Sequence, residues 1–160
     1  MKKIFFTVVF LATAFVQQSL AQDSTSQPQL SQLLHSYYDI KNALVAGNAV
    51  LASTSAEQFV KTANGIDSKA IPEGSITALV KDASHISGTK DIKHQREHFA
   101  NFSTNMFALA KAVKLTSDPI YEAYCPMKKV NWLSSDKAIK NPYFGSSMLT
   151  CGKVVETINQ

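Results

Sequence analysis

Apolar residues recur at helical spacing along the first three quarters of the chain. They form four successive segments between residues 30 and 117, and each segment ends at residues that favour a turn or break a helix. These ends are Gly47-Asn48, Gly65 followed by Ile71-Pro72, Gly88, and Asp118-Pro119. The pattern predicts a mainly α fold in which a four-helix bundle spans residues 30–117.

The fourth segment has the clearest hydrophobic stripe. Its apolar positions lie on one helix face, and two small residues widen the stripe: Ile92, Phe99, Phe102, Ser103, Met106, Leu109, Ala110 and Val113. This pattern is typical of a bundle seam of about 25 residues. We expect Ser75 to cap the third helix and Thr89 the fourth, with Asp91 in its first turn, because hydroxyl oxygens accept hydrogen bonds from free backbone N–H groups there.

The helical period ends at Pro119. The side chains of residues 120–124 alternate in character, as expected for the two faces of a short strand. Residues 154–158 are consistent with a strand or a short helix. Two further stretches read as ordered loops and turns: Trp132-Leu133-Ser134 and Asn141-Pro142-Tyr143-Phe144-Gly145. We therefore expect residues 118–158 to form an irregular C-terminal cap, with short strands and ordered loops, on the bundle of the same domain.

The N-terminal segment has the features of a signal peptide. Lys2 and Lys3 precede an apolar run over residues 4–16, and small residues stand at positions 19 and 21. We expect cleavage after Ala21 and a flexible leader over residues 22–29, which is rich in Ser and Gln. The apolar run is too short to span a bilayer comfortably, so we expect a periplasmic or secreted protein with no membrane segment after cleavage.

The charge balance argues against nucleic-acid binding. Loss of Lys2 and Lys3 lowers the formal net charge from +4 to +2, and Arg96 is the only arginine, whereas nucleic-acid binding needs a dense basic surface. The chain also lacks a Cys-x-x-Cys pair, a Gly-x-Ser-x-Gly motif, a His-Glu-x-x-His motif and a phosphate loop. We expect a non-enzymatic protein, and no oligomeric state follows from these patterns.

Sulfur is concentrated near the C-terminus. Cys125 and Met127 are two residues apart, and Met148 and Cys151 are three apart, so each pair is able to direct two sulfur atoms at one point. Thiolate and thioether ligands favour Cu(I) over harder ions, and a thioether needs no deprotonation. One hypothesis is therefore a soft-metal site, with copper as the ion.

A disulfide is the main alternative for the same two cysteines. Cysteines of exported proteins usually pair, and a bridge between Cys125 and Cys151 closes a loop of about 27 residues, which stabilises a fold by roughly 3–3.5 kcal/mol. Met127 and Met148 would then be packing residues, and no cofactor would be needed. Unpaired buried thiols are a third possibility, and a dithiol that binds metal when reduced and closes when oxidised combines the first two.

A zinc site is a weaker possibility. His94 and His98 are four residues apart on one helix face, and with the two cysteines they would complete a Cys2His2 set, although the order and spacing match no zinc finger. A polar solvent-facing stripe, continued by Asn101 and Asn105, is the simpler interpretation. The other two histidines read as isolated surface residues: His35 and His85.

Three other features near the sulfur residues have two interpretations each. Arg96 either donates hydrogen bonds to carbonyls of the C-terminal loop, and so holds the cap to the bundle, or is a plain surface residue. Lys128-Lys129 either favours a neighbouring thiolate or forms a solvated turn. The aromatic residues of the cap either pack in its core or form a binding face: Trp132, Tyr143 and Phe144.

The C-terminal motifs resemble a bacterial family, domain of unknown function 3347. The matching positions are Tyr124-Cys125-Pro126-Met127, Trp132-Leu133-Ser134, Asn141-Pro142-Tyr143-Phe144-Gly145, Met148-Leu149, Cys151-Gly152, and, in the long helix, Asp91-Ile92, Gln95-Arg96, Phe99 and Ser103. The resemblance implies a small exported helical protein. Because the same domain also occurs on periplasmic adaptor subunits of heavy-metal efflux systems, it further implies metal handling, with copper fitting the sulfur residues and an efflux adaptor as the partner.

Overall fold

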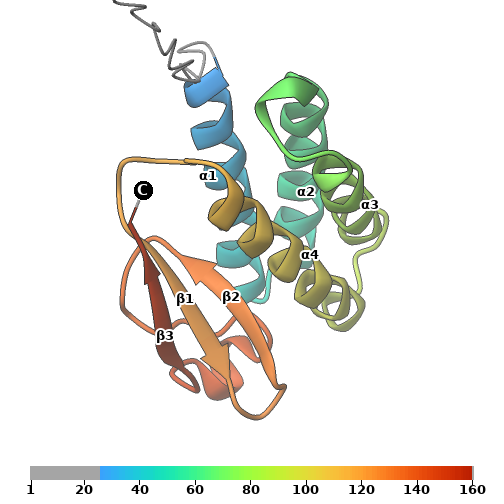
Figure 1. Ribbon diagram of the computed structural model, residues 1–160. Coiled ribbons are helices and arrows are strands. Elements are labelled where there is room, and N and C mark those ends of the chain that lie inside the picture. Colours follow the sequence, from blue (N-terminus) through green and yellow to red (C-terminus); the bar gives the residue numbers. More distant parts are fainter. Residues whose placement is uncertain (1–25, 160) are drawn as a thin grey trace, which may run out of the picture.

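Four helices and a small sheet make up the described part of the chain. The computed structural model describes residues 26–159, so the predicted signal peptide and the cleavage after Ala21 lie outside the described residues. The helices are α1 (Ser26–Val45), α2 (Ala49–Asn64), α3 (Ser75–Ser87) and α4 (Ile92–Ala112), as Figure 1 shows. The prediction of a mainly α four-helix fold with a strand-containing cap is confirmed. Within residues 26–159, no helix is both long enough and apolar enough to cross a membrane.

The first helix is longer than the sequence pattern indicates. It begins at Ser26, so the last four residues of the predicted flexible leader are helical and that part of the prediction is wrong. Gln27 in this turn donates a side-chain hydrogen bond of 3.2 Å to the carbonyl of Lys114, just beyond α4. This tertiary contact, which no local pattern encodes, ties the start of α1 to the end of the bundle.

Two of the predicted helix caps are also shifted. Gly74, with a φ of 78°, precedes α3, and Ser75 is the first helical residue without acting as a side-chain cap. Asp91 rather than Thr89 caps α4: its carboxylate accepts from the backbone N–H of Lys93 at 2.9 Å. Thr89 instead accepts from the N–H of Asp91 at 3.1 Å, so it stabilises the turn before the helix.

The cap contains a three-stranded antiparallel sheet in the order β2-β1-β3. Its strands are β1 (Ile120–Cys125), β2 (Val130–Ser134) and β3 (Lys153–Ile158), and two short 3-10 helices complete the described elements: Ser68–Ala70 and Gly145–Met148. The sequence pattern predicts a loop over residues 132–134, but these residues lie in β2, which pairs with β1 across a tight turn. Residues 154–158 form a strand, which resolves the choice between strand and helix. Residues 132–134 are three consecutive buried positions without alternation, and residues 154–158 fitted two interpretations, so pairing with β1 defines both strands.

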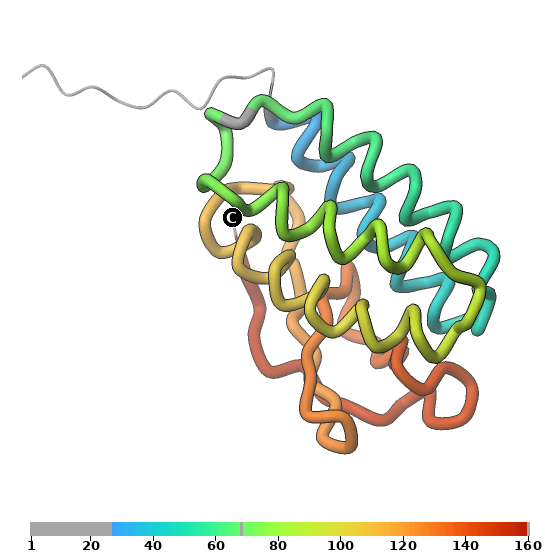
Figure 2. Tube along the Cα trace, turned by 90° about the vertical axis from the view of Figure 1, so that its right-hand side faces the viewer, coloured from blue at the N-terminus to red at the C-terminus, as the bar shows by residue number. Residues whose placement is uncertain are grey.

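The sheet lies along one side of the helices, against α4 (Figures 1 and 2). Tyr37 on α1 connects the layers, because its hydroxyl lies 2.6 Å from the hydroxyl of Ser103 on α4 and accepts the backbone N–H of Leu133 on β2 at 3.0 Å. Its ring packs against Phe99 and Phe102, with ring centroids 5.5 and 5.4 Å away. A buried tyrosine therefore joins two helices and the sheet within one continuous core.

Candidate metal centre

The two cysteines meet at one end of the sheet. Cys125 is the last residue of β1, and β3 starts two residues after Cys151. The antiparallel register pairs Tyr124 with Lys153, so the residues just before β3 lie beside the end of β1. The side chains of Cys125 and Cys151 are neighbours close enough to influence one another's ionisation, and both are free thiols. Strand pairing therefore brings together two sulfur atoms that are 26 positions apart in the sequence.

The two thiols differ in their exposure and their surroundings. Cys125 is fully buried, whereas Cys151 is half-buried. Burial raises the pKa of the Cys151 thiol above its ordinary value, and the neighbouring Cys125 raises it further. The backbone N–H of Met127 bonds to the Cys151 sulfur and acts in the opposite direction. A cation that binds here has to displace a thiol proton, so its affinity rises with pH.

Both methionines flank the thiol pair through their backbones. Met127 contacts Cys151 through its N–H, and the carbonyl of Met148 accepts the N–H of Cys151 at 3.1 Å. Their side chains are at the surface, 65% and 36% exposed respectively. Exposed, unbranched thioethers are able to change rotamer at low cost. The structure thus brings the two cysteines together and places the backbones of both methionines beside them, whereas the two methionine side chains face solvent.

The turn between β1 and β2 forms the outer edge of the centre. It covers residues 126–129, and the N–H of Lys129 donates to the carbonyl of Cys125 at 2.8 Å. Lys129 has a φ of 58°, the left-handed conformation that closes such a hairpin. Lys128 and Lys129 are both exposed, as expected of a solvated turn. Their charges lie at the rim, where solvent screens them.

Asn141 holds the segment that carries Cys151. Its side chain is fully buried, and its amide nitrogen donates to the carbonyl of Cys151 at 2.7 Å. Its side-chain oxygen accepts the N–H groups of Tyr143 and Phe144 at 2.8 and 3.3 Å. The backbone N–H of Asn141 donates to Leu149 at 2.8 Å. Asn141 therefore holds the two ends of the loop between residues 141 and 151 together and fixes the position of Cys151. The sequence motif alone did not define this role.

The aromatic residues of the cap form its core. Trp132 and Tyr143 are 1% and 4% exposed, and their rings meet edge to face with centroids 6.1 Å apart. The Tyr143 hydroxyl donates to the carbonyl of Asn131 at 2.6 Å. A Cβ atom at Gly152 would lie 2.7 Å from the Trp132 ring, which explains why glycine follows Cys151. Trp132 and Tyr143 therefore pack in the core of the cap, whereas Phe144 is half-buried.

Arg96 joins two helices of the bundle by its hydrogen bond and touches the cap only by packing, which differs from the expected hydrogen bond to the C-terminal loop. Its guanidinium donates to the carbonyl of Leu44 in the last turn of α1 at 2.9 Å, not to a carbonyl of the C-terminal loop. Gly145 lies directly against it, since an added Cβ atom would stand 2.6 Å from the guanidinium and 2.9 Å from the carbonyl of Val45. Arg96 therefore sits between the end of α1 and the loop that holds Cys151.

The histidines do not join the cysteines. Among the described residues, His94 and His98 cluster with His85 of α3, and their ligand nitrogens all lie within 4.8 Å of one another. Arg96 lies midway between His94 and His98 in α4 and faces the cap. Because residues two apart on a helix point in opposite directions, His94 and His98 face away from the cap. The Cys2His2 set is thus not assembled, and the prediction that His85 is isolated is wrong; it is exposed but clustered. Burial lowers the pKa of His98, and the nearby His85 and His94 lower it further.

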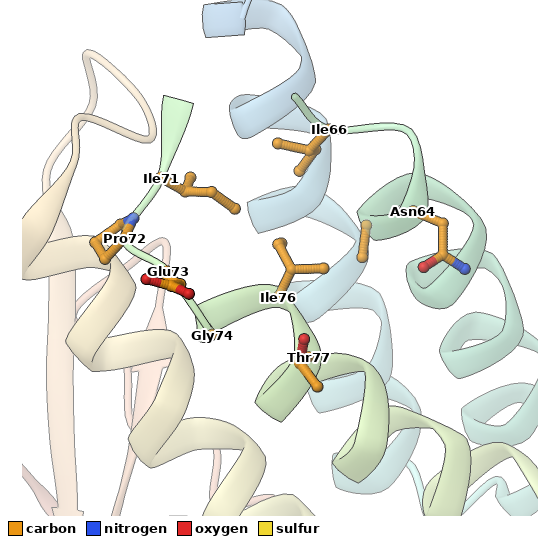
Figure 3. A pocket seen from close by; sticks show the side chains of 9 residues that line it. Asn64, Ile66, Ile71, Pro72, Glu73, Gly74, Ile76 and Thr77 are labelled. Carbon is orange, nitrogen blue, oxygen red and sulfur yellow. The ribbon is translucent and has the colours of Figure 1, made fainter. Parts of the chain in front are cut away.

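A separate pocket lies at the α2–α3 connection, at the opposite end of the bundle from the β1–β2 turn (Figures 1 and 2). It has a volume of about 530 Å³, and Figure 3 shows the side chains of Ile66, Ile71 and Ile76 around it. Glu73 and Asn64 lie at its edge. Its lining contains no cysteine, histidine or methionine, so it lacks the side chains that bind soft metal ions.

Comparison with known proteins identifies the bundle but not the cap. A family model described as "Protein of unknown function (DUF3347)" matches residues 33–118. The match covers more than half of the chain and ends just before β1, so both cysteines lie beyond it. No curated protein and no solved structure matches the chain. The chain belongs to the DUF3347 family of proteins of unknown function.

Proposed function

We propose that the protein is an exported, non-enzymatic domain that binds a soft metal ion, Cu(I), through Cys125 and Cys151, with Met127 and Met148 as further ligands. The single observation that carries the proposal is the proximity of two free thiols, one at the end of β1 and the other in the loop just before β3. Two thiolates at one point, with two thioethers in the adjoining backbone segments, form a donor set that favours Cu(I). The proposal extends to a role in heavy-metal efflux beside a periplasmic adaptor protein, on the strength of the family resemblance.

The arrangement suits capture and release better than permanent burial of an ion. Cys125 lies on the inside and Cys151 at the boundary with solvent, so an ion reaches the pair from one side. The side chains of Met127 and Met148 are exposed and neighbour the pair in the chain, so that their thioethers would be able to contact an arriving ion first. Because sulfur donors exchange by successive replacement, an open face also allows transfer to a second sulfur-containing protein.

The same proximity of the thiols supports a second candidate, a structural or protein-interaction module stapled by a Cys125–Cys151 disulfide. Neighbouring thiols beside adjacent strand ends need little movement to form a bond in an oxidising compartment. Formation of this bond removes two hydrogen atoms, with an external thiol oxidant as the electron acceptor. In that case the cap would be locked against the bundle, and its surface would contact a partner.

Titration of the reduced protein with Cu(I) against a competing chelator separates the two candidates. We expect one tightly bound ion in the wild type, its loss in Cys125→Ser/Cys151→Ser, and roughly tenfold weaker binding in Met127→Leu/Met148→Leu. Met106→Leu is the matched control, because Met106 is fully buried in α4 and its replacement conserves volume. Equal affinity of the wild type and the double-methionine variant would remove the thioethers from the site, and equal affinity of the double-serine variant would overturn the proposal.

The redox state of the exported protein is measured independently. A mass lower than that of the reduced chain by two hydrogen atoms, recovered on treatment with a reductant, would show the disulfide. We expect free thiols in protein exported in the presence of copper, because a bound ion occupies both sulfur atoms. A disulfide under that condition would favour the structural candidate.

A further inference from the structure

The three clustered histidines occupy adjoining turns of two packed helices. His85 lies in the last turn of α3, and His94 and His98 lie one turn apart near the start of α4. The rings of His85 and His98 are stacked, with centroids 4.3 Å apart and planes inclined by 4°, and His94 stands 4.6 Å from His98. Figures 1 and 2 show α3 and α4 side by side, joined by a short connection at this end.

A buried glutamine fixes the backbone between these histidines. Gln95 is fully buried, and its side-chain amide donates to the carbonyls of Thr89 and Ala49 at 2.8 and 2.9 Å, with the carbonyl of Ile86 at 3.2 Å. It therefore ties the residue next to His94 to the residue next to His85 and to the start of α2. Groups carried by rigid, cross-linked elements lose little freedom when they bind an ion.

We propose that His85, His94 and His98 bind one divalent transition-metal ion of the borderline class, such as Zn²⁺ or Cu²⁺, at a site separate from the cysteine pair. Imidazole nitrogens are preferred ligands for these ions, and three protein ligands leave a position for water or a further group. Nitrogen ligands at about 2.1 Å from a tetrahedral ion lie roughly 3.4 Å apart. The ligand nitrogens of the three histidines already lie within 4.8 Å of one another, close to that spacing.

The surroundings of the cluster favour a cation. His85 and His94 are exposed and His98 is half-buried, so their rings are able to turn from the stacked arrangement to one in which their lone pairs converge. Asp82 and Glu97 lie close enough to act electrostatically on His98. The Asp82 carboxylate is itself held by Asn105 at 2.9 Å, so it adds negative charge beside the site from a fixed position.

Nuclear magnetic resonance of the imidazole rings in the wild-type chain tests the proposal directly. On titration with Zn²⁺, we expect the ring signals of His85, His94 and His98 to shift along one common saturation curve. His35, an exposed histidine on α1, is the internal control and should not move. Because the readout is specific to the rings, zinc bound by the cysteines does not affect it. Unchanged ring signals, or a shift of His35 along the same curve, would overturn the proposal.

Substitution provides the second measurement. His85→Asn and His94→Asn should each weaken zinc binding at the rings by at least about tenfold, because loss of a ligand costs no less than loss of an outer hydrogen-bonding partner. His35→Asn should leave the affinity unchanged. His35, His85 and His94 are exposed, so their substitution should change thermal unfolding without metal only slightly. Zinc should raise the unfolding temperature less in His85→Asn and His94→Asn than in the wild type and His35→Asn. Equal affinities in all variants would remove the site.

Discussion

The side-chain amide of Asn141 donates a 2.7 Å hydrogen bond to the backbone carbonyl of Cys151. The two residues are ten positions apart, at the two ends of the loop that brings the second cysteine back to the sheet. Strand pairing alone would place Cys151 near Cys125, but only approximately, because Cys151 lies outside β3. The buried asparagine fixes the remaining freedom, so the geometry of the thiol pair depends on a side chain that contains no sulfur.

Replacement of this asparagine should therefore loosen the arrangement of the two thiols. Asn141→Ala removes three hydrogen bonds and leaves buried backbone groups unpaired, so we expect a loss of about 2–3 kcal/mol in the free energy of unfolding, measured in urea. Asn141→Asp keeps the acceptor for Tyr143 and Phe144 but loses the donor to Cys151. Asn141→Asp should therefore raise the alkylation rate of Cys151 by more than the increase expected from its loss of stability alone. Asn101→Ala, at an exposed position, should change neither the free energy of unfolding nor the alkylation rate. An Asn141→Ala variant as stable as the wild type would contradict the role of Asn141.

Gly145 offers a test of close packing between cap and bundle. It has a φ of 56°, and an added Cβ atom would meet the Arg96 guanidinium at 2.6 Å and the Val45 carbonyl at 2.9 Å. Gly47 has a similar φ of 70°, but nothing lies within 4 Å of the corresponding position. Gly47→Ala thus measures backbone strain alone, about 1 kcal/mol, whereas Gly145→Ala should cost roughly 2 kcal/mol more because the cap has to shift. Equal losses in urea unfolding would show that Arg96 moves aside freely.

The sequence predicted the helices well and their ends less well. A repeated apolar stripe, such as that of α4, persists over many residues and survives single exceptions. A cap depends on one hydrogen bond, so Asp91 and Thr89 are equally good candidates until the geometry decides. The strand that contains Trp132 was missed for a related reason: three consecutive buried positions show no alternation, and β1 supplies the hydrogen bonds that define it.

The hydroxyl of the buried Tyr37 offers a test of the junction between helices and sheet. Tyr37→Phe leaves the N–H of Leu133 buried without its acceptor, so we expect a loss of about 1–3 kcal/mol in the free energy of unfolding. Ser103→Ala leaves that acceptor in place and should cost less. In a double-mutant cycle the two losses should not add, since both act on one hydroxyl. Strict additivity would show that the Tyr37–Ser103 contact contributes nothing.

The candidate metal sites show what residue spacing was able to predict. The sequence made a meeting of Cys125 and Cys151 a hypothesis only, because a 25-residue intervening segment has many possible paths; long-range strand pairing brings them together. For the histidines the helical spacing of His94 and His98 was correct, but the partner was not. His85 is on another helix, and only the packing of α3 on α4 brings it to the cluster. Local periodicity identifies a face of an element, whereas tertiary packing decides what faces it.

The ionisation of Cys151 should depend on its neighbour. Burial is the larger cause of its raised pKa and Cys125 the second, so in Cys125→Ser the pKa should fall toward its ordinary value of 9.0 without reaching it. The pH profile of alkylation in the reduced protein measures this shift, because only the thiolate reacts. A raised folded-state pKa means that the folded protein holds the proton more tightly than the unfolded chain. The contribution of this proton to the stability of the reduced wild type is therefore fully present below pH 9.0 and is lost as the pH rises from 9.0 toward the folded-state pKa. In Cys125→Ser the decline in stability should be smaller. Identical pH profiles of alkylation in the two proteins would show that Cys125 does not influence the ionisation of Cys151, and would weaken the case for a shared metal site.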